Sequence, residues 1–200
     1  GAPAAVAGLL RAIHALDLAS LPAAAGDGHS EAGAGIDLSP LDPGRELVRL
    51  RQGLGRRDPL RDLPHAAEHR LRAAAGRAGA RPERAVICHN DLLRANRLIH
   101  RGQLLAIDWE YARPGDAFFD LAVVASELAG AQRAALHAAY LQRPPTPEEQ
   151  RQLMDRLVLY SAIAACWYAR HGGAQATRSA LDRLVAVTRD APPGDDGAGP

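Results

Sequence analysis

Lysine is absent from this 200-residue sequence, and all 24 basic residues are arginines. The acidic residues number 23, so the formal net charge is only +1 when the histidines are neutral. A charge balance of this kind argues against a protein dedicated to coating nucleic acid or to scavenging acidic ligands. The apolar content of 47% is ordinary for a soluble globular protein, and the length is sufficient to bury a sizeable core.

Cysteines and long apolar runs are also scarce. The two cysteines, Cys88 and Cys166, lack Cys-x-x-Cys spacing, which excludes a disulfide framework and a four-cysteine zinc site. No apolar run approaches the roughly 18 residues of a membrane span, and no signal peptide is recognised. We therefore expect a cytoplasmic protein without a membrane partner.

Aromatic residues make up only 4% of the chain, and all of them lie between Trp109 and Tyr168. Residues 45–84 hold eleven arginines against five acidic residues, but no aromatic side chain that could stack on a base. A solvated helical surface explains this basic segment better than a nucleic-acid interface. We expect no nucleic-acid partner.

Apolar residues at helical spacing predict that helices make up most of the chain. The expected helices are residues 3–18, 39–54, 63–78, 117–129, 131–141, 147–171 and 174–190. Ser39-Pro40 and Asp116 have the chemistry of a helix start. Glycines predict a loop over residues 22–40, and the Pro-, Gly- and Asp-rich residues 191–200 are expected to be disordered.

The hydrophobic pattern changes in the middle of the chain. Residues 85–88 form a short apolar run of the strand type. Residues 97–100 and 103–107 flank Arg101-Gly102, which predicts a hairpin with a glycine turn. Pro114-Gly115 predicts a further turn. The expected fold class is mainly α with a small central β-hairpin.

Polar residues surround this predicted hairpin. Asp91 follows a buried strand in a loop, where catalytic groups usually lie. Asn96 enters the hairpin and Asp108 leaves it, so Asn96 is expected opposite Ile107 or Asp108, roughly 5 Å away. Carboxylate and amide oxygens suit Mg²⁺, whose coordination is often completed by substrate phosphates. Asp91, Asn96 and Asp108 therefore form a candidate phosphoryl-transfer site.

The same stretch resembles a known pair of motifs. His-Asn-Asp-Leu-Leu-Arg-Ala-Asn at residues 89–96, followed by Ile-Asp-Trp-Glu-Tyr at 107–111, resembles the catalytic and metal loops of protein-kinase-like enzymes. It is most similar to the aminoglycoside phosphotransferase and choline kinase family, and within it to choline- and thiamine-kinase-like members. Residues 9–16 and 115–122 also resemble this family. The resemblance covers most of residues 4–170.

The resemblance implies the helical C-lobe of a protein-kinase-like fold over residues 1–190, with a catalytic loop at 88–96 and a metal loop at 107–111. Transferred residue by residue, it makes Asp91 the catalytic base, and Asn96 and Asp108 the residues that hold Mg²⁺ and the nucleotide phosphates. His89 and Asp120 would support the catalytic loop.

Three further residues are candidates for substrate contacts. Glu110 belongs to the metal loop, and the resemblance assigns it no definite role. Trp167 and Tyr168 lie on a late predicted helix, and aromatic rings can enclose a quaternary or thiazolium cation. Packing is the commoner use of such rings.

The function implied is a small-molecule kinase that transfers the γ-phosphoryl group of ATP, with Mg²⁺, to a hydroxyl of a small cationic metabolite of the choline, ethanolamine or thiamine type. The alternatives are an aminoglycoside phosphotransferase and a non-catalytic lone C-lobe that serves as a binding module. Such kinases carry a Gly-rich loop and a lysine in an N-terminal lobe, and this chain has neither. We expect the chain to lack that lobe, to be poorly active alone and to self-associate.

One motif suggests a different enzyme class. His65-Ala66-Ala67-Glu68-His69 matches the H-x-x-E-H pattern of inverted zinc peptidases. On a helix, this spacing would place both histidines on one face. A match this short occurs easily by chance, so a solvated helix surface is the favoured interpretation.

Overall fold

The computed structural model describes residues 2–17, 39–78 and 84–190. The chain divides into two compact units, the first formed by Gly1–Leu41 with Ala80–Pro145 and the second by Asp42–Gly79 with Thr146–Pro200. None of the helices in the described ranges is long and apolar enough to cross a membrane. The predicted disordered tail and most of the predicted loop over 22–40 lie outside the described residues.

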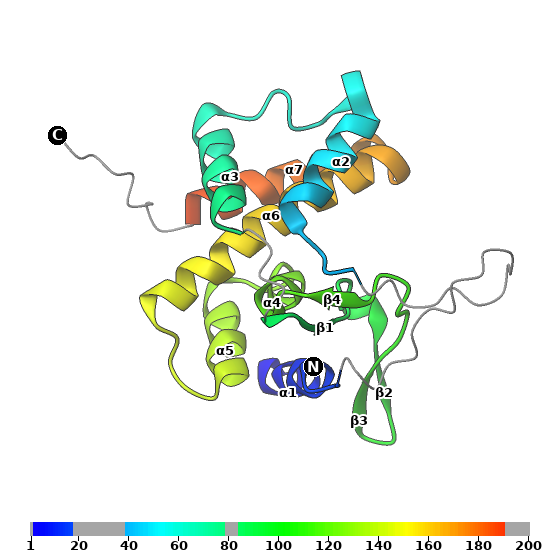
Figure 1. Ribbon diagram of the computed structural model, residues 1–200, viewed down its shortest axis with the longest axis vertical. Coiled ribbons are helices and arrows are strands. Elements are labelled where there is room, and N and C mark those ends of the chain that lie inside the picture. Colours follow the sequence, from blue (N-terminus) through cyan, green and yellow to red (C-terminus); the bar gives the residue numbers. More distant parts are fainter. Residues whose placement is uncertain (1, 18–38, 79–83, 191–200) are drawn as a thin grey trace, which may run out of the picture. The chain divides into compact units, whose positions relative to one another are not determined.

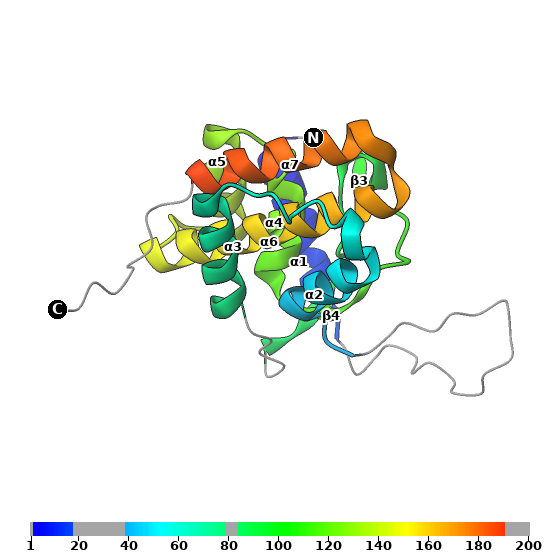
Figure 2. The same ribbon diagram turned by 90° about the horizontal axis from the view of Figure 1, so that it is seen from above.

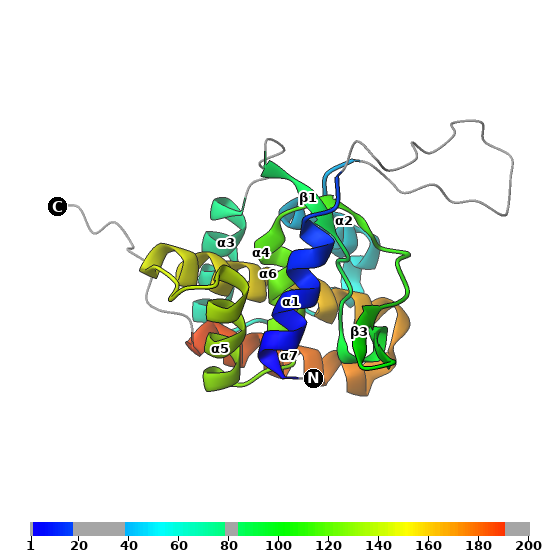
Figure 3. The ribbon, with the colours of Figure 1, turned by 90° about the horizontal axis from the view of Figure 1, so that it is seen from below.

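The first unit combines three helices with two pairs of short strands (Figure 1). Its elements are α1 (Pro3–His14), β1 (Val86–Cys88), η4 (Arg94–Asn96), β2 (Arg97–His100), β3 (Gln103–Ala106), β4 (Arg113–Gly115), α4 (Ala117–Ala125) and α5 (Gly130–Leu141). Helix α1 contacts α5, α4, β1 and β3 and lies at the centre of this unit (Figure 3). The fully buried Leu10, Leu92 and Leu121 belong to its core.

Strands β2 and β3 form the predicted hairpin. The two strands pair antiparallel with His100 opposite Gln103 and Arg97 opposite Ala106. Arg101 and Gly102 both have positive φ, 49° and 78°, the conformation required at the two central positions of a type I′ hairpin turn. This hairpin positions Asn96 at one end and Asp108 at the other.

The prediction of a turn at Pro114-Gly115 is wrong. These residues belong to β4, which pairs antiparallel with β1 so that Ile87 lies opposite Pro114. A Cβ on Gly115 would lie 3.3 Å from the Sγ of Cys88, so the missing side chain permits a close approach. Local turn propensity does not reveal a strand that pairs with a distant partner.

Helix α4 is almost completely buried and begins where predicted. The Asp116 side chain accepts a hydrogen bond from Phe118 N at 2.9 Å, which caps the helix. Residues 119–125 are all buried. The helix ends at Ala125 rather than at 129, and α1 similarly ends at His14 rather than at 18.

The second unit consists of helices packed around α6. Its elements are α2 (Pro43–Leu54), η2 (Gly55–Arg57), α3 (His65–Arg77), α6 (Pro147–His171) and α7 (Gly173–Asp190). Helices α2, α3 and α7 all contact α6 (Figure 2). Helix α6 begins with a capping box in which Thr146 and Glu149 each accept from the other residue's backbone N–H.

Helix α2 starts later than predicted. Its N-cap is Asp42, whose Oδ1 accepts from Gly44 N at 3.0 Å and from Arg45 N at 3.1 Å, and Pro43 occupies the first turn. Ser39-Pro40 therefore precedes the helix. Leu41 N instead donates to Pro114 O at 2.8 Å, which ties this segment to β4. Two adjacent cap-and-proline pairs compete in the sequence, and tertiary pairing selects the second.

Candidate active site

The loop that follows β1 brings Asp91 and Asn96 into direct contact. Asn96 Nδ2 donates to Asp91 Oδ2 at 2.7 Å and to Asp91 O at 2.8 Å. Asn96 O accepts from Ile107 N at 3.0 Å, so the predicted pairing of Asn96 with the end of the second hairpin strand is confirmed. Asp91 is half-buried, with one carboxylate oxygen oriented by the Asn96 amide.

His89 is completely buried, and both of its ring nitrogens contact the backbone. Nδ1 faces Asp91 N at 3.4 Å, and Nε2 lies 2.9 Å from Ile107 O. An acceptor at Nδ1 and a donor at Nε2 describe the neutral ring protonated at Nε2. The Trp109 ring covers the imidazole, with ring centroids 4.8 Å apart. The imidazole thus links the catalytic loop to the end of the hairpin.

The carboxylate of Asp120, in the first turns of α4, holds the start of the loop. Its Oδ2 accepts from His89 N at 3.0 Å and its Oδ1 accepts from Asn90 N at 2.8 Å. The Asp120 side chain is fully buried, and a buried carboxylate of this kind depends on its hydrogen bonds. Burial and the adjacent carboxylates Asp120 and Asp116 raise the pKa of the neighbouring Cys88 thiol.

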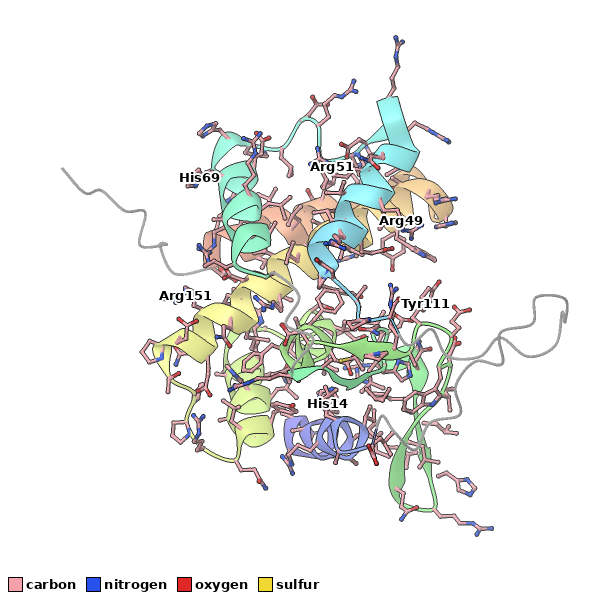
Figure 4. The ribbon with its side chains drawn as sticks, in the orientation of Figure 1. His14, Arg49, Arg51, His69, Tyr111 and Arg151 are labelled. Carbon is pink, nitrogen blue, oxygen red and sulfur yellow. The ribbon has the colours of Figure 1, made fainter. Side chains whose placement is uncertain are left out.

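His14 of α1 provides a third partner for Asp120. Its Nε2 lies 3.0 Å from Asp120 Oδ2, and its Nδ1 lies 2.8 Å from the hydroxyl of Tyr140 on α5 (Figure 4). Burial is the main cause that raises the pKa of Tyr140 to about 12, so this hydroxyl keeps its proton at neutral pH. Three helices, α1, α4 and α5, therefore meet at one carboxylate behind the catalytic loop.

Asp108 and Glu110 lie in the exposed segment that follows β3. Asp108 has a positive φ of 64°, and Asn90, next to Asp91, has a φ of 63°. Asn90 Nδ2 donates to Tyr111 O at 2.9 Å, so the catalytic loop and the metal loop are also joined directly. Tyr111 itself is 46% exposed (Figure 4).

Negative charge accumulates around Asp91. Burial raises the pKa of Asp91, and the nearby charges of Asp108 and Glu110 raise it further, whereas Asn96 and His89 act in the opposite direction. The three carboxylates are therefore close enough to repel one another. A divalent cation among them would relieve this repulsion.

Comparison with known proteins places this geometry in a family. A model of the phosphotransferase enzyme family (APH) matches residues 2–156, more than half of the chain. The chain belongs to this family. A search of curated proteins finds no match.

Several solved structures share the fold of this APH-family chain. A choline/ethanolamine kinase family protein from Mesorhizobium loti is 16% identical with a TM-score of 0.66, over 92% of this chain and 60% of its own. Choline kinase LicA from Streptococcus pneumoniae is 18% identical with a TM-score of 0.66, over 94% and 63%. Macrolide 2′-phosphotransferase type I is 19% identical with a TM-score of 0.63, over 91% and 58%. The chain thus spans less than two thirds of each of these structures and has the fold of their helical lobe.

The oxygen donors of the APH-family site fit a magnesium ion. Asn96 uses its Nδ2 for both hydrogen bonds to Asp91, so its Oδ1 carries the lone pairs that could face a cation. Asp108 is exposed and adds a full negative charge. Hard oxygen donors beside mutually repelling carboxylates match the preferences of Mg²⁺.

The two aromatic candidates belong to the second unit. Trp167 and Tyr168 lie on α6 and contact each other edge to face, with ring centroids 5.3 Å apart. Trp167 also contacts the His171 ring at 4.8 Å. Their predicted role in substrate binding stays a prediction.

The H-x-x-E-H motif does not form a metal site in the structure. His65 and His69 are exposed on α3, and Glu68 pairs with Arg72 at 2.5 Å (Figure 4). Within the described ranges, the one group of three potential ligands close enough for a metal is His14, Cys88 and Asp120. The hydrogen bonds described above already occupy both oxygens of Asp120 and both ring nitrogens of His14. Solvated helix surface is therefore the better account of the motif.

Three residues near the site were not anticipated from the sequence: His14, Asn90 and Glu127. His14 belongs to a segment that resembles the family, but nothing in its local sequence points to Asp120. Glu127 lies seven residues after Asp120, a spacing that keeps both on one side of a helix. This spacing is the signal that could have identified Glu127.

Proposed function

We propose that this chain is the catalytic helical lobe of a small-molecule kinase, which transfers the γ-phosphoryl group of ATP to a hydroxyl group. The observation that carries the proposal is the Asp91–Asn96 contact of 2.7 Å at the mouth of the hairpin, next to the charges of Asp108 and Glu110. Membership of the phosphotransferase family supports the same reaction class.

In this reaction Asp91 accepts the proton of the acceptor hydroxyl. The hydroxyl oxygen forms a bond to the γ-phosphorus while the bond from that phosphorus to the bridging oxygen of ADP breaks. The proton then leaves Asp91 for solvent, so the carboxylate is restored. The hydrogen bond from Asn96 orients one oxygen of Asp91, and the other oxygen remains to accept the proton.

Asn96 and Asp108 would hold Mg²⁺ at this site. When bound, the ion neutralises charge on the nucleotide phosphates. His89 and Asp120 act on the backbone: the former through Asp91 N and Ile107 O, the latter through His89 N and Asn90 N. Their contribution is to keep the loop in one conformation, which matters because phosphoryl transfer depends mainly on positioning.

For the acceptor, we propose a small cationic alcohol of the choline, ethanolamine or thiamine type. The names of two similar structures, a choline/ethanolamine kinase family protein and a choline kinase, support this class. An antibiotic acceptor is the second candidate, supported by the similarity to a macrolide 2′-phosphotransferase. Assay of the full-length protein with choline, ethanolamine, thiamine, aminoglycosides and macrolides distinguishes these acceptors.

The role of Asp91 is tested by Asp91→Asn in the full-length protein. Loss of the base should lower kcat by about 10²- to 10⁴-fold, while ATP binding is largely retained because the amide is isosteric. The measurement is steady-state phosphate transfer combined with calorimetric titration of ATP. Turnover equal to that of the wild type would contradict the assignment of Asp91 as the base.

A further inference from the structure

The carboxylate of Glu127 lies against the second half of the catalytic loop. Glu127 follows α4 in the turn that ends this helix, where its N–H donates to Val124 O at 3.2 Å. Both of its carboxylate oxygens lie 2.9 Å from Arg94 N, the first amide of η4. A charged acceptor on a backbone amide is one of the stronger hydrogen bonds in proteins.

The same carboxylate pairs with the guanidinium of Arg97, the first residue of β2. The Arg97 side chain is only 9% exposed, and its Nε has no hydrogen-bond partner in the described part of the chain. Burial lowers the pKa of Arg97, the Glu127 charge opposes this shift, and the nearby Arg94 charge adds to it. Glu127 is therefore the acid that makes a buried arginine tolerable at this position.

These contacts lie on either side of Asn96. Asp120 holds the start of the catalytic loop through the amides of residues 89 and 90. Glu127 holds its end through the amide of residue 94 and the side chain of residue 97. Both acids come from α4 and the turn that follows it, so one buried helix sets both ends of the loop.

We propose that Glu127 is a positioning residue, which fixes residues 94–97 so that the Asn96 amide keeps its contact with Asp91. The catalytic consequence of this clamp rests on the proposed phosphotransferase function, whereas the clamp itself is a property of the chain alone. The competing explanation is that Glu127 only neutralises the buried charge of Arg97. In that case, removal of both side chains together would cost nothing further.

Three variants of the full-length protein separate the two explanations. Arg97→Met removes the buried charge but keeps the bond from Arg94 N to Glu127. The double variant Glu127→Ala with Arg97→Met removes the charge and the acceptor together, so the loop loses its clamp without an unpaired buried arginine. Glu127→Gln keeps an acceptor oxygen for Arg94 N and removes only the negative charge.

The first readout is amide hydrogen exchange of residues 93–97 without nucleotide or metal. The double variant should melt close to Arg97→Met, yet its Arg94 amide should exchange about ten- to a hundredfold faster, the loss expected for a hydrogen bond to a charged group. Glu127→Gln should retain most of the protection. The second readout is kinetic: kcat of the double variant should fall at least about tenfold below that of Arg97→Met, with the acceptor KM unchanged.

Equal Arg94 exchange and equal kcat in Arg97→Met and the double variant would overturn the proposal and leave charge neutralisation as the role of Glu127. A wild-type protein that transfers phosphate to no acceptor would instead contradict the proposed function. Because exchange is measured without substrate, it would still decide whether Glu127 holds the loop.

Discussion

At the scale of single residues, the site depends on two left-handed backbone positions. Asn90 and Asp108 have φ values of 63° and 64°. A residue with a Cβ pays about 1–2 kcal/mol for this conformation, and Asn and Asp tolerate it best among the non-glycine residues. Each position lies directly beside a functional candidate or is one, so the tight backbone turns are located where the catalytic and metal loops meet.

Asn90→Gly and Asn90→Ala should separate the backbone requirement of this position from its side-chain contacts. Both variants remove the hydrogen bond from Asn90 Nδ2 to Tyr111 O, but only alanine keeps a Cβ. We expect the glycine variant to be more stable than the alanine variant by about 1 kcal/mol. Urea unfolding measures the difference, and an alanine variant of equal or greater stability would contradict the argument.

The metal site makes an unequal prediction for its two ligands. Asp108→Ala removes a full negative charge and should abolish the Mg²⁺ dependence of nucleotide binding. Asn96→Ala should weaken it less, because a neutral amide is the poorer ligand. Calorimetric titration of ATP with and without Mg²⁺ tests this, with Asp182→Ala in α7 as a control for the loss of one exposed acidic residue. If neither variant alters the Mg²⁺ dependence, the metal binds elsewhere.

At the scale of secondary-structure elements, helices α3 and α6 are joined by a buried ion-pair network. Asp155 on α6 accepts two hydrogen bonds from Arg77, at 2.8 and 2.9 Å, and lies 3.4 Å from Arg70. The side chains of Asp155 and Arg70 are 2% and 9% exposed. Two guanidinium groups on one carboxylate leave an excess of positive charge, so the network depends on its single acid.

Asp155→Ala should therefore destabilise the protein by about 3–5 kcal/mol, because it leaves Arg70 buried without a counter-ion. Arg72→Ala provides the matched control, since it breaks the exposed pair with Glu68 and should cost less than about 1 kcal/mol. Denaturant unfolding of both variants gives the comparison. Similar losses in the two variants would show that the buried network contributes no more than a surface pair.

At the scale of the whole molecule, the first unit exposes apolar side chains on and beside its hairpin. They are Leu98, Ile99, Leu105, Ile107, Trp109 and Tyr111, each at least 39% exposed. Leu98 lies opposite Leu105 in the pairing register, so these two share one face of the hairpin. An exposed group of this kind favours association with another surface.

The chain of residues 1–200 should fold cooperatively, transfer phosphate much more slowly than a full-length kinase, and self-associate. It contains no lysine to pair with the nucleotide phosphates and no Gly-rich loop to cover them. Light scattering coupled to gel filtration, with ATP turnover on the acceptor panel, tests both points. Ile99→Ser, at a position 68% exposed, should reduce self-association more than Val48→Ser, at 54% on α2.

Activity of this chain equal to that of a full-length version would contradict the prediction. It would show that the lobe carries a phosphate-binding device of its own. Equal effects of Ile99→Ser and Val48→Ser on self-association would show that the hairpin surface is not the contact.

The sequence by itself determined the features that depend on neighbouring residues. The hairpin at Arg101-Gly102, the Asp116 cap and the last three helices follow from turn chemistry and periodicity, and the pairing of Asn96 with Ile107 follows from the hairpin. Tertiary structure alone decided the rest. Strand β4, the late start of α2, the contact of His14 with Asp120 and that of Glu127 with Arg94 all join residues far apart in the chain. Such contacts form only when packing brings the segments together, and local propensity carries no record of them.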